Sequence, residues 1–167
     1  MIFFFFHLFC FAVLAFSATA LFGQEVKLLT IPKINEVPQI DGKLDDDCWL
    51  EAALAKDFRQ RRPEEGALAT EKTEGRICRK EKVLYIGVRC FDSQPDKIRA
   101  GVMQRDAPVK GDDYFFVLLD PFQRSREGYY FRTNPNGAKG EALINSDMRR
   151  PNMDWDTIWE VRSHRDE

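Results

Sequence analysis

Histidine is nearly absent from this chain of 167 residues, which contains only His7 and His164. A zinc site needs more nitrogen or sulfur ligands than the sequence supplies. Catalysis of the Ser-His-Asp or Cys-His kind needs a histidine within the body of the domain. No glycine-rich phosphate-binding loop occurs either. These absences exclude zinc chemistry, histidine-activated nucleophiles and P-loop nucleotide binding.

An excess of charge of one sign is also missing, because 25 Lys and Arg balance 27 Asp and Glu to a net charge of −2. Nucleic-acid-binding domains and polybasic membrane-surface modules both depend on concentrated positive charge. The composition therefore predicts no nucleic-acid partner.

Charge is entirely absent from the first 24 residues, which hold 8 of the 14 Phe. A run of small residues, Ser17 to Ala20, follows the apolar stretch, as at a signal-peptidase site. We predict that residues 1–23 are a signal peptide and that the protein is exported to the periplasm, to the cell surface or outer membrane, or into the medium. A retained membrane anchor is the alternative, since this length just spans a bilayer core.

Three cysteines follow the leader: Cys48, Cys78 and Cys90. In the predicted hairpin, Cys78 lies opposite about residue 84, six residues from Cys90, or roughly 20 Å along the strand. A disulfide needs Cα atoms within about 7 Å, so this pair should not bond. All three are interpreted as small buried apolar residues, with free-thiol chemistry as the alternative.

Alternating apolar residues and frequent turn signals predict an all-β protein, an antiparallel two-sheet β-sandwich of the immunoglobulin or jelly-roll kind, with a barrel as the alternative. One short helix should begin at Asp45 or Asp46 and bury Trp49 as a core anchor. Residues 113–120 are apolar on both faces, which predicts a central strand. Strands are expected at residues 26–34, 73–79, 83–92, 98–103, 113–120, 128–134, 138–145 and 155–162.

The chain stops shortly after a predicted turn at His164 and Arg165, which leaves the strand at residues 155–162 without a partner. We therefore expect a domain that is incomplete at its C-terminus.

Several Asp residues are candidates for a metal site: Asp112, Asp113, Asp154 and Asp156. Alternate positions on a strand, such as the last two, face the same side, and calcium prefers such hard oxygen ligands. Turn capping is the alternative interpretation, and a pair of glycosidase carboxylates is the third.

Tyr130, Arg132 and Asn134 share one face of the strand predicted at residues 128–134. An aromatic ring can stack on a pyranose while Arg and Asn hydrogen-bond to its hydroxyl groups. These residues are therefore the candidate carbohydrate site, and the alternative is a surface strand with a snorkelling Arg.

Residues 38–46, together with Trp49 and Ala52, resemble the opening of the family 9 carbohydrate-binding module. Further segments follow in the family's order and spacing: residues 83–88, 105–106, 112–120, 131–137 and 155–159. Arg132 matches an Arg that contacts sugar in binding members of the family. Lys110 and Phe116 stand where those members have a Trp and a Glu.

The resemblance implies a carbohydrate-binding domain, truncated at its C-terminus, over residues 37–167, after an N-terminal segment at residues 24–36. Its implied ligand is a polysaccharide or oligosaccharide, and structural calcium is the implied cofactor. The implied role is non-catalytic, within a larger protein of polysaccharide catabolism or uptake. The most similar domains continue into a region predicted to be an outer-membrane β-barrel, which is the implied cis partner. Two alternatives are a structural domain without sugar affinity and part of a hydrolase acting on O-glycosyl compounds.

Overall fold

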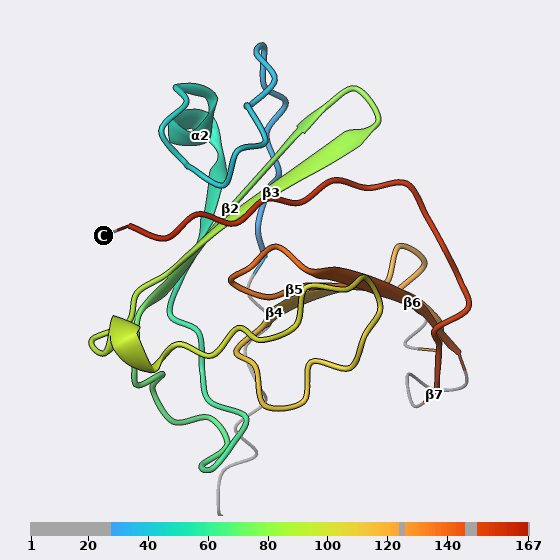
Figure 1. Cartoon of the computed structure of the whole chain (residues 1–167). Helices are drawn as coiled ribbons and strands as arrows, with labels where there is room; N and C mark the ends of the chain where they lie inside the picture. Colours follow the sequence, from blue (N-terminus) through green and yellow to red (C-terminus); the bar gives the residue numbers. More distant parts are fainter. Residues whose placement is uncertain (1–27, 124–125, 146–149, 167) are drawn as a thin grey trace, which may run out of the picture.

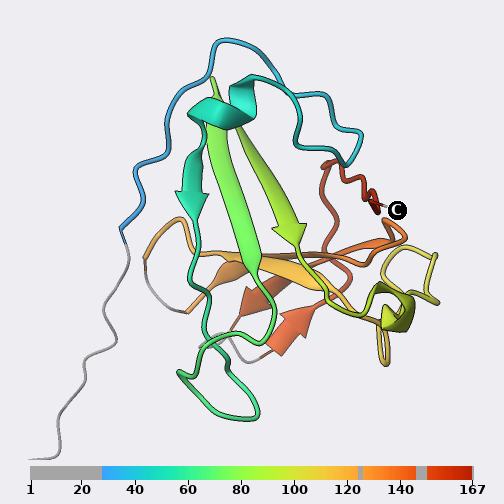
Figure 2. The same cartoon turned by 90° about the vertical axis from the view of Figure 1, so that its left-hand side faces the viewer.

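The computed structural model describes residues 28–123, 126–145 and 150–166, and they form two antiparallel sheets with very little helix (Figure 1). The first sheet has the order β1-β2-β3 and the second the order β4-β5-β6-β7. The prediction of an all-β, two-sheet sandwich is therefore confirmed. The strands of the two sheets run in crossing directions (Figure 2). The strands are β1 (Ala53–Ala55), β2 (Thr73–Lys80), β3 (Val83–Cys90), β4 (Phe115–Leu119), β5 (Gly128–Thr133), β6 (Lys139–Asn145) and β7 (Arg150–Asn152).

The long hairpin of β2 and β3 forms where the alternation of apolar residues predicted it. Its two-residue turn contains Glu81 at φ 51°, a left-handed conformation that matches the twist of a tight hairpin. The register pairs Cys78 with Tyr85, one residue from the predicted position. Cys78 and Cys90 are both free thiols, as the register argument required.

A single turn of helix, α2 (Cys48–Glu51), packs against this hairpin and forms the main apolar core. Trp49 is 3% exposed and Cys78 is fully buried, which agrees with the predicted core anchor. The N-cap residue of the helix is Asp47 rather than the predicted Asp45 or Asp46, and it makes no side-chain capping bond. Gly87 allows the close packing, since a Cβ at this position would lie 2.4 Å from Leu44 Cδ2.

Cys90 differs from the other two thiols because it is exposed at the end of β3, so the prediction that all three cysteines are buried is wrong for this residue. Burial raises the pKa of both Cys48 and Cys78. Buried, protonated thiols of this kind act as small apolar side chains.

In the second sheet, the prediction that residues 113–120 form a central strand is wrong. β4 lies at the edge of the sheet, and within the described residues β5 is its only partner. Phe116 and Leu118 are 47% and 43% exposed, so this apolar strand is covered on one side only. Its continuous apolar run, which predicted a central strand, instead supplies one half-buried face and one open face. β5 and β6 form within a residue of their predicted bounds.

The strand predicted at residues 155–162 does not pair, and this prediction is wrong. The chain instead forms the short β7 beside β6 and then crosses the molecule toward β3 (Figure 1). The predicted alternation is nevertheless present, because odd-numbered residues from Trp155 to Val161 are half-buried and even-numbered ones are exposed. Contacts by side chains therefore hold this segment in place of a hydrogen-bond ladder.

Two other predicted strands are absent from the described residues. The N-terminal one, seen from Leu28 onward, contains only a parallel bridge between Lys33 and Arg79. Residues 98–103 are irregular and follow a 3-10 turn, η1 (Pro95–Lys97). The predicted signal peptide lies outside the described residues. Among the residues described, no helix is long and apolar enough to cross a membrane.

Candidate functional site

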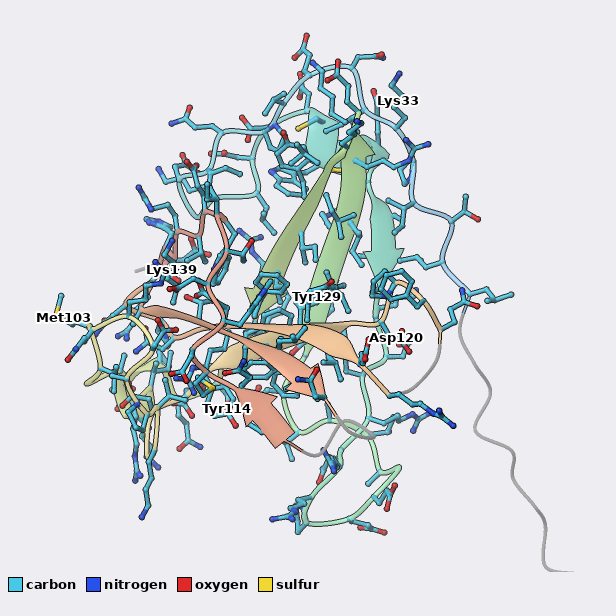
Figure 3. The ribbon with its side chains drawn as sticks, turned by 90° about the vertical axis from the view of Figure 1, so that its right-hand side faces the viewer. Lys33, Met103, Tyr114, Asp120, Tyr129 and Lys139 are labelled. Atoms are coloured by element: carbon cyan, nitrogen blue, oxygen red, sulfur yellow. The ribbon has the colours of Figure 1, made fainter. Side chains whose placement is uncertain are left out.

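One face of the second sheet carries an exposed row of aromatic side chains. The register of β4 and β5 places Phe116 opposite Arg132, and Leu118 opposite Tyr130. Side chains of paired residues point to the same side of a sheet, and so does Tyr114, two residues before Phe116. We call these five residues the outer face. Figure 3 shows Tyr114 on the opposite side of the sheet from Tyr129.

The rings of the outer face lie in contact. The centroids of Tyr114 and Phe116 are 6.3 Å apart, and those of Phe116 and Tyr130 are 5.4 Å apart. Tyr114 is 50% exposed and Phe116 is 47% exposed, so both present open ring surface to solvent. Partial burial raises the pKa of the Tyr130 phenol, and the nearby Arg132 partly opposes this shift. The phenol is therefore a neutral hydrogen-bonding group at ordinary pH.

Arg132 is held in a fixed position on the outer face. Its Nη2 donates to the carbonyl oxygens of Ala107, at 2.8 Å, and of Asp106, at 3.2 Å. The side chain lies across Gly140, where a Cβ would come within 2.7 Å of Arg132 Nε. A side chain at position 140 would displace the guanidinium from this place, so the glycine opposite Arg132 in β6 helps to position it.

Asn134 has a different environment from the one predicted, because its side chain is only 2% exposed. Its Nδ2 donates to Val102 O at 2.7 Å and to Asp112 Oδ2 at 2.9 Å. Its Oδ1 accepts from the backbone N–H groups of Asn136 and Ala138. Both ends of the amide are therefore engaged in holding the turn between β5 and β6.

The predicted metal ligands have separate partners. Asp112 accepts hydrogen bonds from the backbone of Val102 and Gly101, which lower the pKa of its carboxyl group. Asp113 accepts from the N–H of Arg99 at 2.8 Å, so the Asp112–Asp113 pair fastens the start of β4 to residues 99–102.

Asp154 is exposed, and Asp156 pairs with Arg105 at 2.8 Å. No cluster of three or more His, Cys, Asp or Glu suited to a metal occurs in the described part of the chain. The four Asp are not brought together, and calcium at these residues stays a prediction.

The opposite side of the sheet, which we call the inner face, holds a buried ion pair that the sequence reasoning missed. Glu141 is fully buried on β6, and its Oε1 accepts a hydrogen bond from Arg105 Nη2. The same guanidinium contacts Asp156 and, more loosely, Asp106. A Glu directly before the apolar residues 142–144 of the return strand was the available signal, since a buried charge is retained only when it is paired.

Burial alone would raise the pKa of Glu141, but hydrogen bonds from Arg105 and the backbone of Thr157, together with the nearby indole of Trp159, lower it below the usual value. Trp159 Nε1 and Glu141 Oε2 are nevertheless both buried without an aligned hydrogen bond. The nearby indole N–H therefore favours the ionised form of the carboxylate without an aligned hydrogen bond. Glu141 is a structural anion that orients Arg105 and Trp159.

A cleft of about 410 Å³ lies beside this ion pair, between the turn that precedes β6 and the last described segment. Met103 and Lys139, both labelled in Figure 3, belong to its wall. The remaining lining residues are Arg105, Gly137, Ala138, Ile158, Trp159, Glu160, Val161 and Arg162. Lys139 Nζ lies over the Trp159 ring in this wall, 5.6 Å from its centroid, as a cation–π contact.

No protein-family model, curated protein or solved structure matches this chain. The open aromatic row on the outer face is accordingly the strongest chemical feature that the chain itself provides. Exposed rings beside a fixed guanidinium can stack on a ligand with an apolar face and hydrogen-bonding edges.

Proposed function

We propose that this protein is a non-catalytic, exported carbohydrate-binding module that serves a larger protein of polysaccharide catabolism or uptake. The exposed row of Tyr114 and Phe116 beside Tyr130 on the outer face carries the proposal. A pyranose ring has one face of C–H groups and a rim of hydroxyl groups, which is the complement of such a row. The ligand would lie along the row, with its ring faces toward the aromatic side chains.

Two of the predicted site residues keep a role in this proposal. Tyr130 presents its phenol beside the row, and Arg132 retains donors beyond the Nη2 atom that binds the Asp106 and Ala107 carbonyls. Because these contacts fix the guanidinium in advance, little side-chain entropy is lost when a sugar hydroxyl binds it. We do not include Asn134, because both ends of its amide bond to the protein.

The test is calorimetric titration of the protein with xylo- and cello-oligosaccharides. We expect saturable binding that Phe116→Ala weakens at least about tenfold, since one stacked ring contributes on the order of 1.4 kcal/mol. Phe91→Ala is the matched control, because Phe91 is 40% exposed but lies just beyond β3, in the other half of the molecule. It should leave binding unchanged. Equal losses for both variants, or no heat from the folded wild type, would contradict the proposal.

A structural domain without sugar affinity is the second candidate. One observation favours it: the guanidinium of Arg132 is tied to backbone carbonyls, while Phe116, directly opposite, offers no hydrogen bond. This candidate predicts the absence of binding heat in a protein with a normal cooperative unfolding transition. A hydrolase remains the third candidate, and it predicts turnover of an O-glycosyl substrate that falls when a candidate Asp is changed to Asn.

A further inference from the structure

The segment at residues 155–162 is extended but belongs to neither sheet. It runs by itself from β7 across to the first sheet (Figure 1). None of its residues has a positive φ, so its backbone is compatible with that of a β-strand. Its side chains alternate as in a strand, with Trp155 and Trp159 turned toward the Phe131 ring. The segment therefore has the side-chain alternation of a strand but no ladder of hydrogen bonds.

The two edges of this segment differ. In an extended chain, the backbone N–H and C=O groups of successive residues point to opposite edges. Two odd-numbered residues use theirs internally: the Thr157 N–H faces Glu141 Oε1 at 3.5 Å, and the Trp159 carbonyl accepts from Lys139 Nζ at 3.0 Å. One edge is thereby fastened to the body of the protein.

The other edge is formed by the backbone of the even-numbered residues, Asp156, Ile158, Glu160 and Arg162. Their N–H and C=O groups make no hydrogen bond to any part of the chain that the structure describes. In addition, the Ile158 side chain is 100% exposed. An open edge with an exposed β-branched side chain is a template for pairing with another strand.

We propose that this edge binds the same edge of a second copy of the chain, as an antiparallel strand pair centred on Trp159. The charges of the segment select both the occupant and the register. With Trp159 opposite itself, Asp156 lies opposite Arg162 of the second copy, and this pairing occurs twice by symmetry. The contact is isologous and therefore closes at two chains.

Neighbouring registers are disfavoured. A shift of two residues in one direction places Glu160 opposite itself, and a shift in the other direction places Asp156 opposite Glu160. Like charges directly opposite on paired strands destabilise the pair. Asp156 can keep its bond to Arg105 in the dimer, because a carboxylate accepts several hydrogen bonds.

The expected association is weak. A pair of eight-residue strands lies at the small end of specific interfaces, so we expect a dissociation constant of about 10–300 µM. The test is sedimentation velocity of the purified protein between about 5 and 500 µM. We expect a monomer that converts to a dimer as the concentration rises. A single monomeric species over the whole range would overturn the proposal.

A charge exchange tests the interface itself. Arg162→Asp places two carboxylates opposite each other at both ends of the pair, and Asp156→Arg does the same with two guanidinium groups. Each variant alone should dimerise at least about tenfold more weakly than the wild type over the same range of concentration. An equimolar mixture should recover the dimer, because each Asp of one variant then faces an Arg of the other.

Arg165→Asp is the matched control, since it makes the same change of charge at an exposed residue outside the segment. It should dimerise like the wild type. Thermal unfolding of each variant verifies that it is folded. A dissociation constant in both single variants equal to that of the wild type, or a mixture of folded variants that binds no more tightly than either variant alone, would show that these strands do not form the contact.

Discussion

The two faces of the β4–β7 sheet carry similar side chains in opposite surroundings. On the inner face, Tyr129 and Phe131 contact Trp155 and Trp159, with ring centroids 5.2 to 6.2 Å apart. On the outer face the rings contact one another, and half of the Tyr114 surface remains in water. A single crossing segment makes the difference. Aromatic content alone therefore does not tell whether a sheet face is part of the core or open to a ligand. Whether another segment of the chain covers that face decides it.

The largest loss of stability is expected when the ring at the centre of the inner face is removed. Phe131→Ala takes away contacts with both Trp155 and Trp159, and it should lower the free energy of unfolding by about 3 kcal/mol. Urea denaturation followed by tryptophan fluorescence measures this loss and also reports whether the crossing segment has detached. A loss below about 1 kcal/mol would mean that the segment does not depend on this ring.

Asn134 tests the turn that joins the two central strands. Asn134→Ala removes a buried amide, takes the acceptor from two backbone N–H groups and the donor from the Val102 carbonyl, so stability should fall by about 2 kcal/mol. Asn136→Ala is the matched control, since this neighbouring amide is exposed and makes one bond, to the Ala100 carbonyl. Its cost should stay under about 1 kcal/mol. Similar losses for both variants would assign the effect to the turn in general.

The charge on Glu141 gives the inner face a pH dependence in the acid range. Because its folded pKa lies below the value in the unfolded chain, about 4.3, its contribution is complete above that pH and is lost as pH falls through the folded pKa. We expect the melting temperature of the wild type to exceed that of Glu141→Gln at pH 6, and the gap to narrow toward pH 3. A gap that stays constant with pH would contradict this linkage.

Much of the fold follows from local pattern. The β2–β3 and β5–β6 hairpins carry clear alternation and turn residues, and they form within one or two residues of their predicted bounds. The core position of Trp49 followed from the helical spacing around it. These elements form through contacts between residues that are close together in the sequence. A local sequence pattern contains information about contacts of that kind.

The predictions that were wrong or missing concern tertiary contacts, that is, which segment packs against which face of a sheet. The apolar run of β4 satisfied the pattern of a central strand but lies at an edge, and Asn134 has the parity of the outer face but turns into the β5–β6 loop. The ion pair of Arg105 with Glu141 joins residues 36 apart. Each of these depends on tertiary contacts between distant segments, about which alternation carries no information.

The smallest change in stability is expected where the proposed function is concentrated. Phe116→Ala makes the same substitution as Phe131→Ala, one strand away and on the opposite face, with the ring already 47% exposed. The free energy of unfolding should fall by less than about 1 kcal/mol, because little buried apolar surface is lost. Urea denaturation of this variant beside Phe131→Ala measures the contrast directly. A cost near that of Phe131→Ala would show that the outer face is a second core, and the open ring surface that supports glycan binding would no longer be available to a ligand.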